Sequence, residues 1–98
     1  MFRSQSVARE TAILVLLTLS RGAKSRKKIL FSLLSGPKNC NQLSSEIGLD
    51  WWGVQNHLQR LLSEKLVESL DCGKLSYYEI TSKGEEALKL AKKALNIS

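Results

Sequence analysis

The spacing of hydrophobic residues changes along the 98-residue chain, and each change indicates a different kind of element. A helix is expected over residues 7–20, and from 12 to 19 its apolar side chains fall on every face of a helical wheel, which is typical of a helix buried on all sides. From 24 to 64 they recur at intervals of three and four, which predicts amphipathic helices. These helices are expected over residues 24–34, 40–47 and 51–64.

After residue 64 the hydrophobic period shortens to two, which predicts a hairpin of strands 66–70 and 75–80. If Cys72 and Gly73 form its two-residue turn, Leu70 faces Leu75 across the ladder. Helical spacing then returns over 82–97, so the predicted fold is mainly α, of the α+β class.

Helix starts carry capping residues. Asn39, three residues before Gln42, predicts a capping box, and Asp50 can cap the helix that follows it. Ser82 and Glu85 have the spacing of a second capping box at the start of the last helix. The helix ends are therefore defined by local chemistry.

The composition favours a polyanionic partner. Fifteen Lys and Arg residues against nine Asp and Glu give a net charge of +6, and nucleic acid is the commonest polyanion that such proteins bind. A chain of this length makes one domain with a modest interior, which a partner chain would enlarge.

The sequence offers little catalytic chemistry. Its two cysteines, Cys40 and Cys72, and its one histidine, His57, are scattered, so neither a metal site nor any other cofactor is expected. Without a nucleophile–base pair or a carboxylate pair, we expect no enzyme. The apolar run 12–17 is shorter than the ~20 residues that cross a bilayer, and no signal peptide is recognisable, so no membrane partner and a cytoplasmic location are expected.

The chain from about Lys24 to Leu90 resembles the winged helix-turn-helix of ArsR-like and MarR-like regulators, closest to small archaeal members. The positions that carry this resemblance are Leu43, Ile47, Gly48, Leu49, Trp51, Val54, His57, Leu58, Leu61, Leu66, Val67, Tyr78, Ile80, Thr81 and Gly84. It implies an added N-terminal helix over 7–20, a helix-turn-helix core and wing over 24–80, and a C-terminal dimerisation helix over 82–97.

The sequence departs from the family pattern at two positions. Gly53 stands where such helices often carry Ser or Thr, and Lys65 stands where Gly usually closes the helix. A lysine in the left-handed conformation there would cost of order 1 kcal/mol.

The resemblance makes helix 51–64 the recognition helix for double-stranded DNA. On its wheel Trp51 lies with Val54 and Leu58, which predicts a core position, while Trp52 lies on the opposite, polar arc. Amide and guanidinium groups match the edges of adenine and guanine in the major groove. The base-reading candidates are Trp52, Gln55, Asn56, Gln59 and Arg60.

Basic residues elsewhere are candidates for the phosphate backbone, which supplies affinity without sequence information. The phosphate candidates are Lys24, Arg26, Lys27, Lys28, Lys38, Ser63 and Lys74. Lys89, Lys92 and Lys93 share one side of the last helix, which is most simply a solvated face.

The first and last helices carry more apolar surface than one small core covers, which predicts a homodimer through 7–19 and 88–97. The interface candidates are Ile13, Leu16, Leu17, Leu88, Ala91 and Leu95.

Three functions fit these observations. The first is a homodimeric, sequence-specific DNA-binding transcriptional regulator. The second is an architectural or nucleoid protein in which phosphate contacts dominate, and the third is a protein-interaction winged helix without DNA contact. The polar face of helix 51–64 and the basic helix 24–34 favour DNA.

Overall fold

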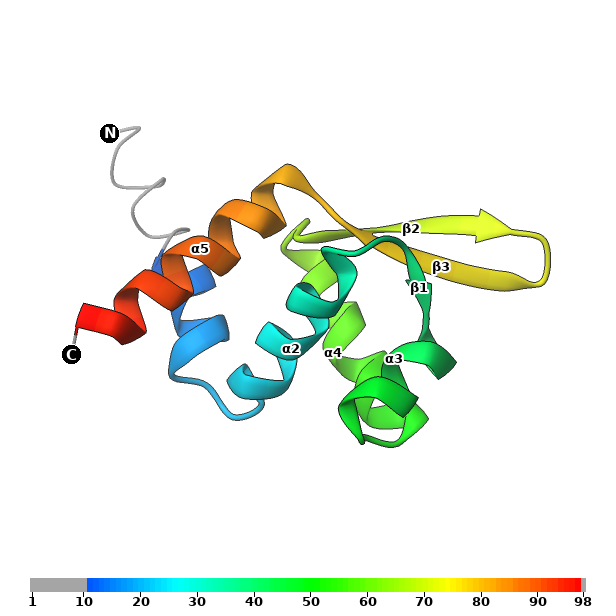
Figure 1. The fold of residues 1–98 in the computed structure, drawn as a ribbon, viewed down its shortest axis with the longest axis horizontal. Coiled ribbons are helices and arrows are strands. Elements are labelled where there is room, and N and C mark those ends of the chain that lie inside the picture. Colours follow the sequence, from blue (N-terminus) through cyan, green and yellow to red (C-terminus); the bar gives the residue numbers. More distant parts are fainter. Residues whose placement is uncertain (1–10, 98) are drawn as a thin grey trace.

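The computed structural model describes the backbone of residues 11–97 and the side chains of that range except those at 72 and 95–97. A helical segment at 11–18 comes first. Seven elements follow it: α2 (Ala23–Leu33), β1 (Lys38–Asn39), α3 (Cys40–Ile47), α4 (Trp51–Ser63), β2 (Val67–Cys72), β3 (Leu75–Ile80) and α5 (Ser82–Ile97) (Figure 1). The predicted class, a mainly helical fold with one hairpin, is confirmed.

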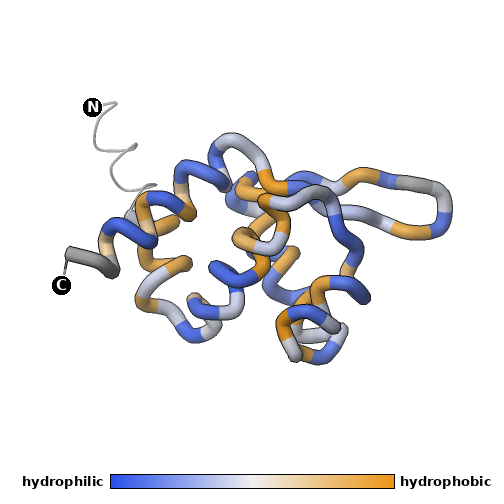
Figure 2. The backbone as a smooth tube through the Cα atoms, in the orientation of Figure 1, coloured by the Kyte–Doolittle hydropathy of each residue, from blue (hydrophilic) through white to orange (hydrophobic). Residues whose placement is uncertain are grey.

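The core lies where α2, α3 and α4 meet under α5 and the helical segment 11–18. Apolar positions recur along each of these helices (Figure 2), and those that face inward join one cluster. Its largest fully buried side chains are Leu17, Ile29, Leu30, Leu33, Leu43, Leu58, Leu61 and Leu66. The hairpin projects from this body, so most of its strand length lies outside the core (Figure 1).

Two of the predicted helix starts are confirmed. The Asn39 side chain accepts a hydrogen bond from the Gln42 backbone N–H at 2.8 Å, and Gln42 Oε1 accepts one from the Asn39 N–H at 2.9 Å. Asp50 Oδ1 accepts from the Gly53 N–H at 2.7 Å. The first turn of α3 and the first turn of α4 are therefore each held by a side chain that satisfies a backbone donor.

The predicted cap of α5 is wrong by one residue. Thr81, not Ser82, caps the helix, because Thr81 Oγ1 accepts from the Gly84 N–H at 3.0 Å. The same hydroxyl donates to the Lys65 carbonyl at 2.8 Å, which joins α5 to the end of α4. Gly84 is needed there, since a Cβ on it would lie 2.1 Å from the Leu66 carbonyl oxygen.

The sheet has three antiparallel strands in the order β1-β3-β2. The two-residue strand β1 was not predicted, since so short a segment shows no alternation. The hairpin turn is also displaced from its predicted place. Cys72 pairs with Leu75 and Leu70 with Tyr77, so the turn residues are 73 and 74. Gly73, with φ 69°, has the positive φ of the first turn residue in a type II′ hairpin. The turn thus lies one residue later than predicted and the strand pairing is shifted by two residues, so every side chain stays on its predicted face.

The N-terminal helix is buried on one face only, contrary to prediction. Leu16 and Leu17 enter the core, whereas Val15 and Leu19 are 40% and 81% exposed. The inner side of the segment shares a core cluster with Leu88 of α5, and the described residues leave its outer side exposed. Positions 7–10 of the predicted helix lie outside the described residues. No described helix is long and apolar enough to cross a membrane.

Lys65, two residues after the last residue of α4, has a left-handed conformation, with φ 61°. The Leu66 N–H donates to the Leu61 carbonyl and the Lys65 N–H to the Leu62 carbonyl, both at 2.9 Å. These two bonds form a Schellman motif, in which glycine is favoured at the left-handed position. The predicted strain at Lys65 is therefore present.

Replacing Lys65 by glycine should raise the free energy of unfolding by about 1 kcal/mol, because the Cβ responsible for the strain is removed. Urea unfolding of the two proteins measures the difference. Lys65→Ala is the matched control and should gain little, since alanine keeps its Cβ. Equal effects of the two substitutions would show that the backbone is not strained there.

Candidate nucleic-acid interface

Helix α4 turns one face to the core and the opposite face to solvent. Val54, Leu58 and Leu61 are completely buried, which fixes the rotation of the helix. The opposite arc contains the base-reading candidates. Of these, Trp52, Asn56, Gln59 and Arg60 are exposed and Gln55 is half-buried. The structure thus places all five on one accessible helix.

Trp51 is not in the core, so that prediction is wrong. It is 41% exposed, and its ring meets the ring of Trp52 edge-on, with centroids 5.0 Å apart and planes at 89°. A helical wheel gives the direction of a side chain but not its height along the axis. Trp51 begins α4 and helical side chains lean toward the N-terminus, so its ring lies beyond the end of the core. The two rings form one exposed aromatic corner.

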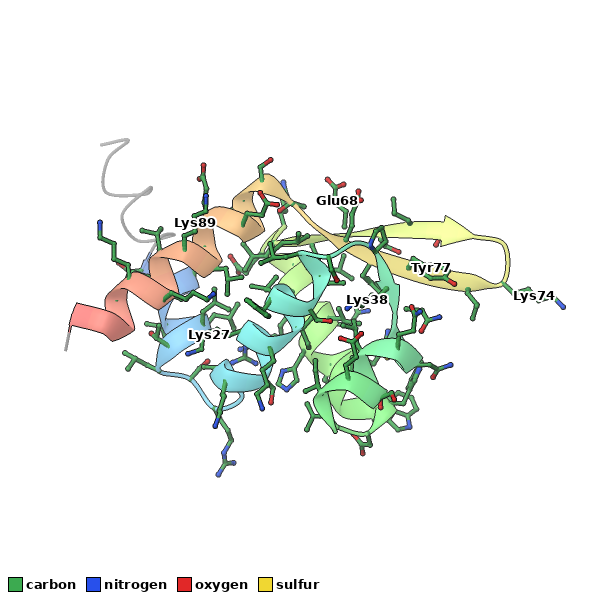
Figure 3. All side chains as sticks on the ribbon, viewed as in Figure 1. Lys27, Lys38, Glu68, Lys74, Tyr77 and Lys89 are labelled. Atoms are coloured by element: carbon green, nitrogen blue, oxygen red, sulfur yellow. The ribbon has the colours of Figure 1, made fainter. Side chains whose placement is uncertain are left out.

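A cleft of about 250 Å³ connects this corner to the wing. It is lined by Asn41 of α3, by Trp51 and Gln55 of α4, and by Lys74 and Ser76 of the hairpin. Lys74 stands at the far tip of the hairpin (Figure 3). Residues from both helices of the helix-turn-helix and from the wing therefore share one surface.

The other phosphate candidates have different surroundings. Lys38 Nζ forms an ion pair with Glu46 Oε1 at 2.8 Å, and Ser63 Oγ donates to the Arg60 carbonyl at 2.8 Å. Three α2 lysines, Lys24, Lys27 and Lys28, line a separate groove to which α4 contributes no residue. The structure therefore groups Lys74, but not the α2 lysines, with the base-reading face.

Arg26 is buried, with 4% of its surface exposed, so it is not a phosphate contact. Its Nε donates to the Leu16 carbonyl at 3.1 Å, and its Nη2 donates to the Arg21 carbonyl at 2.8 Å and to Ser20 Oγ at 2.5 Å. Its Nη1 lies 3.2 Å from His57 Nδ1. Loss of hydration and the charge of Arg60 lower the pKa of Arg26. One guanidinium thus ties the end of the N-terminal helix to α4.

The sequence held a signal for this burial that the prediction missed. Arg26 belongs to a basic run, which favours a surface position. It also stands three, four and seven residues before the buried residues Ile29, Leu30 and Leu33 of the same helix. That spacing puts Arg26 on the apolar stripe of α2.

His57 is held neutral by these surroundings. Its Nδ1 must accept from the Arg26 guanidinium, which has donors only, so the ring proton belongs on Nε2. Burial, and then the charge of Arg26, lower the pKa of His57. Gly22, with φ 84°, packs so closely that a Cβ would lie 2.6 Å from His57 Cε1. His57 is therefore a packed, hydrogen-bonded side chain.

Cys40 is a buried free thiol whose Sγ lies 3.5 Å from the Trp51 carbonyl oxygen, and burial raises the pKa of the thiol. A raised pKa lowers the thiolate fraction and with it the reactivity of the sulfur. In the part of the chain with described side chains, no group of three or more His, Cys, Asp or Glu is placed to hold a metal ion.

The predicted interface residues are mostly used within the chain itself. Ile13, Leu16, Leu17, Leu88 and Ala91 are buried in the intramolecular core, so a partner cannot cover them. This corrects the prediction for these five, and the Leu95 side chain lies outside the described residues. The first and last helices pack on each other and on α2, which consumes their inward faces. Large apolar side chains remain exposed on both helices, at Val15, Leu19 and Leu90.

Solved structures of similar fold are found in three distant organisms. The homodimeric winged helix-turn-helix DNA-binding domain Mb0332 from Mycobacterium bovis, described as a possible ArsR-family transcriptional regulator, has a TM-score of 0.70 at 25% identity, over 97% of this chain and 83% of that chain. The transcriptional regulator BldR from Sulfolobus solfataricus gives 0.73 at 19% identity, over 97% and 69%. Reduced HlyU from Vibrio cholerae gives 0.72 at 18% identity, over 96% and 97%.

The chain has a winged helix-turn-helix fold. In this fold α3 and α4 are the helix-turn-helix, and β2 and β3 are the wing, as the resemblance implied. No protein-family model and no curated protein matches the sequence. The relationship is therefore visible in the arrangement of elements rather than in residue identity.

The contact between Arg26 and His57 predicts a stability that depends on pH. Because the pKa of His57 is lowered in the folded state, the unfolded chain binds the proton more readily. The free energy of unfolding should keep its full value above about pH 6.5, and it should fall as the pH drops below that value. The slope should stay below about 1.4 kcal/mol per pH unit, the limit for one proton, because His57 is only half-buried.

Urea unfolding between pH 5 and 7 measures this slope, with those pH limits set around the ordinary imidazole pKa of about 6.5. His57→Gln keeps an acceptor for Arg26 but cannot be protonated, so its stability should change less over the same range. An unchanged slope in His57→Gln would assign the pH dependence to other groups.

Proposed function

We propose that this chain is a sequence-specific, DNA-binding transcriptional regulator that acts as a homodimer and inserts α4 into the major groove. The observation that carries the proposal is the exposed arc of α4, in which amide and guanidinium side chains follow an aromatic corner. The similar folds of a DNA-binding domain and of a transcriptional regulator support it.

The exposed side chains of α4 match what the major groove displays. Asn56 and Gln59 can each donate one hydrogen bond to an adenine edge and accept one from it. Arg60 can donate two hydrogen bonds to a guanine edge. The exposed ring of Trp52, at 69%, can pack on thymine methyl groups or deoxyribose. The α4 residues opposite them are fully buried, so the helix presents this face without rotating.

The wing supplies the contact that does not depend on sequence. Lys74 stands at its tip and shares a cleft with Gln55 of α4, so one duplex can reach both. A lysine at a phosphate displaces counterions, which adds affinity for every sequence alike. The net charge of +6 assists approach to the polyanion.

The dimer rests on apolar rows that the single chain leaves open. Ala12, Val15 and Leu19 form one row on the N-terminal helix, and Leu90 and Ala94 form another on α5. The inward faces of both helices lie in the same core cluster, and we propose that the two outward rows serve one interface. Burial of each large side chain contributes roughly 1.5–3 kcal/mol, and a two-fold axis through this surface would cover both copies.

Selection of bound fragments from a random-sequence duplex pool tests the DNA proposal. We expect an inverted repeat whose half-sites lie about one helical turn apart, roughly 34–36 Å, or a multiple of it. Arg60→Ala should remove preference at one or two positions per half-site, worth about 1–3 kcal/mol per contact. Lys74→Ala should weaken binding to all sequences and reduce the salt slope by about one.

Two results would contradict this proposal. Tight binding without an enriched sequence, with the same uniform loss for both variants, would identify an architectural DNA-binding protein. No binding to any duplex would identify a winged helix that serves protein interactions alone.

The dimer proposal predicts that Leu19→Asp yields monomers in sedimentation at micromolar concentration, because it places an unpaired charge in the interface. Leu19 is 81% exposed in one chain, so the substitution should leave the fold of the monomer intact. Leu75→Asp is the control, since Leu75 is also exposed but lies on the wing. A wild-type protein that sediments only at 11.0 kDa would overturn the proposal.

A further inference from the structure

A groove of about 980 Å³ runs between α2, the end of α3 and α5. Its apolar lining includes Phe31 of α2 and Leu34 just after that helix, which are 58% and 47% exposed, and Leu88 of α5. Exposed apolar side chains that lie together and are rimmed by polar residues mark interaction sites. The recognition helix α4 contributes nothing to the lining, so the groove is separate from the candidate DNA surface.

The charge around this groove is strongly one-sided. Five lysines line it against one glutamate, Glu46, whose carboxylate is already bound to Lys38 and to Ser32. Both Lys27 and Lys38 are visible on this side of the molecule (Figure 3). From α5, Lys92 reaches across and places its Nζ 4.6 Å from the centre of the Phe31 ring. An apolar floor with a basic rim favours an occupant that is apolar on one side and acidic on the other.

We propose that this groove binds an acidic amphipathic helix of another protein. The 11-residue α2 is about 16 Å long, so its side of the groove matches about three turns of a second helix. Apolar residues of the partner would lie on Phe31 and Leu34, and its acidic residues would face Lys24, Lys28 and Lys92. The proposal does not depend on DNA binding.

Other occupants fit this groove less well. A small ligand needs fixed polar groups for orientation, yet the rim consists of flexible lysines, and no buried side-chain nitrogen or oxygen in the described range lacks a hydrogen-bond partner. A second copy of this chain would bring its own charge of +6 to a basic rim. Duplex DNA would satisfy the lysines but leave the apolar floor uncovered.

A labelled synthetic peptide of three helical turns, with leucine on one face and glutamate elsewhere, tests the proposal by fluorescence anisotropy. We expect it to bind, and we expect a peptide of the same composition with a scrambled apolar face to bind less. Phe31→Ser and Lys92→Glu should each weaken binding by roughly five- to tenfold. Lys89→Glu is the matched control, since Lys89 is exposed on the same helix but does not line the groove (Figure 3).

Failure of the ordered peptide to bind, or equal losses for Lys92→Glu and Lys89→Glu, would overturn the proposal. The same four proteins are then titrated with the selected duplex. A loss of DNA affinity in Lys92→Glu that Lys89→Glu does not show would assign the groove to the phosphate backbone instead. Unchanged DNA affinity together with weakened peptide binding would support two separate surfaces.

Discussion

The buried guanidinium of Arg26 connects the parts of this molecule whose relative placement matters most. It fills the space where the N-terminal helix ends, where the turn at Gly22 begins α2, and where α4 passes at His57. A buried cation is costly unless it is fully hydrogen-bonded, and here two carbonyls, a hydroxyl and an imidazole satisfy it. None of these four partners is charged, so the buried cation is stabilised by hydrogen bonds alone. Each partner must therefore stay within hydrogen-bond distance of the guanidinium.

This connection relates the proposed dimer surface to the proposed DNA surface. The apolar row at Val15 and Leu19 lies on the helix whose Leu16 carbonyl accepts from Arg26, and His57 lies next to Asn56 on α4. The N-terminal helix and α4 therefore meet both at this side chain and in the core cluster that Leu17 and Leu58 share.

The basic residues, which share one sign of charge, have three distinct environments. Arg26 is inside the protein, Lys74 stands at the wing tip beside the recognition face, and Lys28 and Lys92 border an apolar groove on another side. A net charge describes only their sum. The apolar neighbours of each lysine, such as Phe31 in the groove, are what separate a surface suited to DNA from one suited to a protein.

The sequence by itself determined the order of elements and the core of each helix. Helical period, alternation and the caps at Asn39 and Asp50 are local properties, so they could be predicted without a partner in space. Local pattern also identified the exposed arc of α4 from Trp52 to Arg60. It failed for Trp51, because the height of a residue relative to the end of the core depends on which helices surround it.

Only the tertiary structure decided the cap at Thr81, the burial of Arg26 and the faces left open on the first and last helices. Each depends on segments distant in sequence. Gly84 must pass the Leu66 carbonyl, Arg26 meets His57, and Leu17 packs in one cluster with Leu88. The spacing of apolar residues shows that a residue faces an interior. The shape and polarity of that interior depend on the other helices and strands around it.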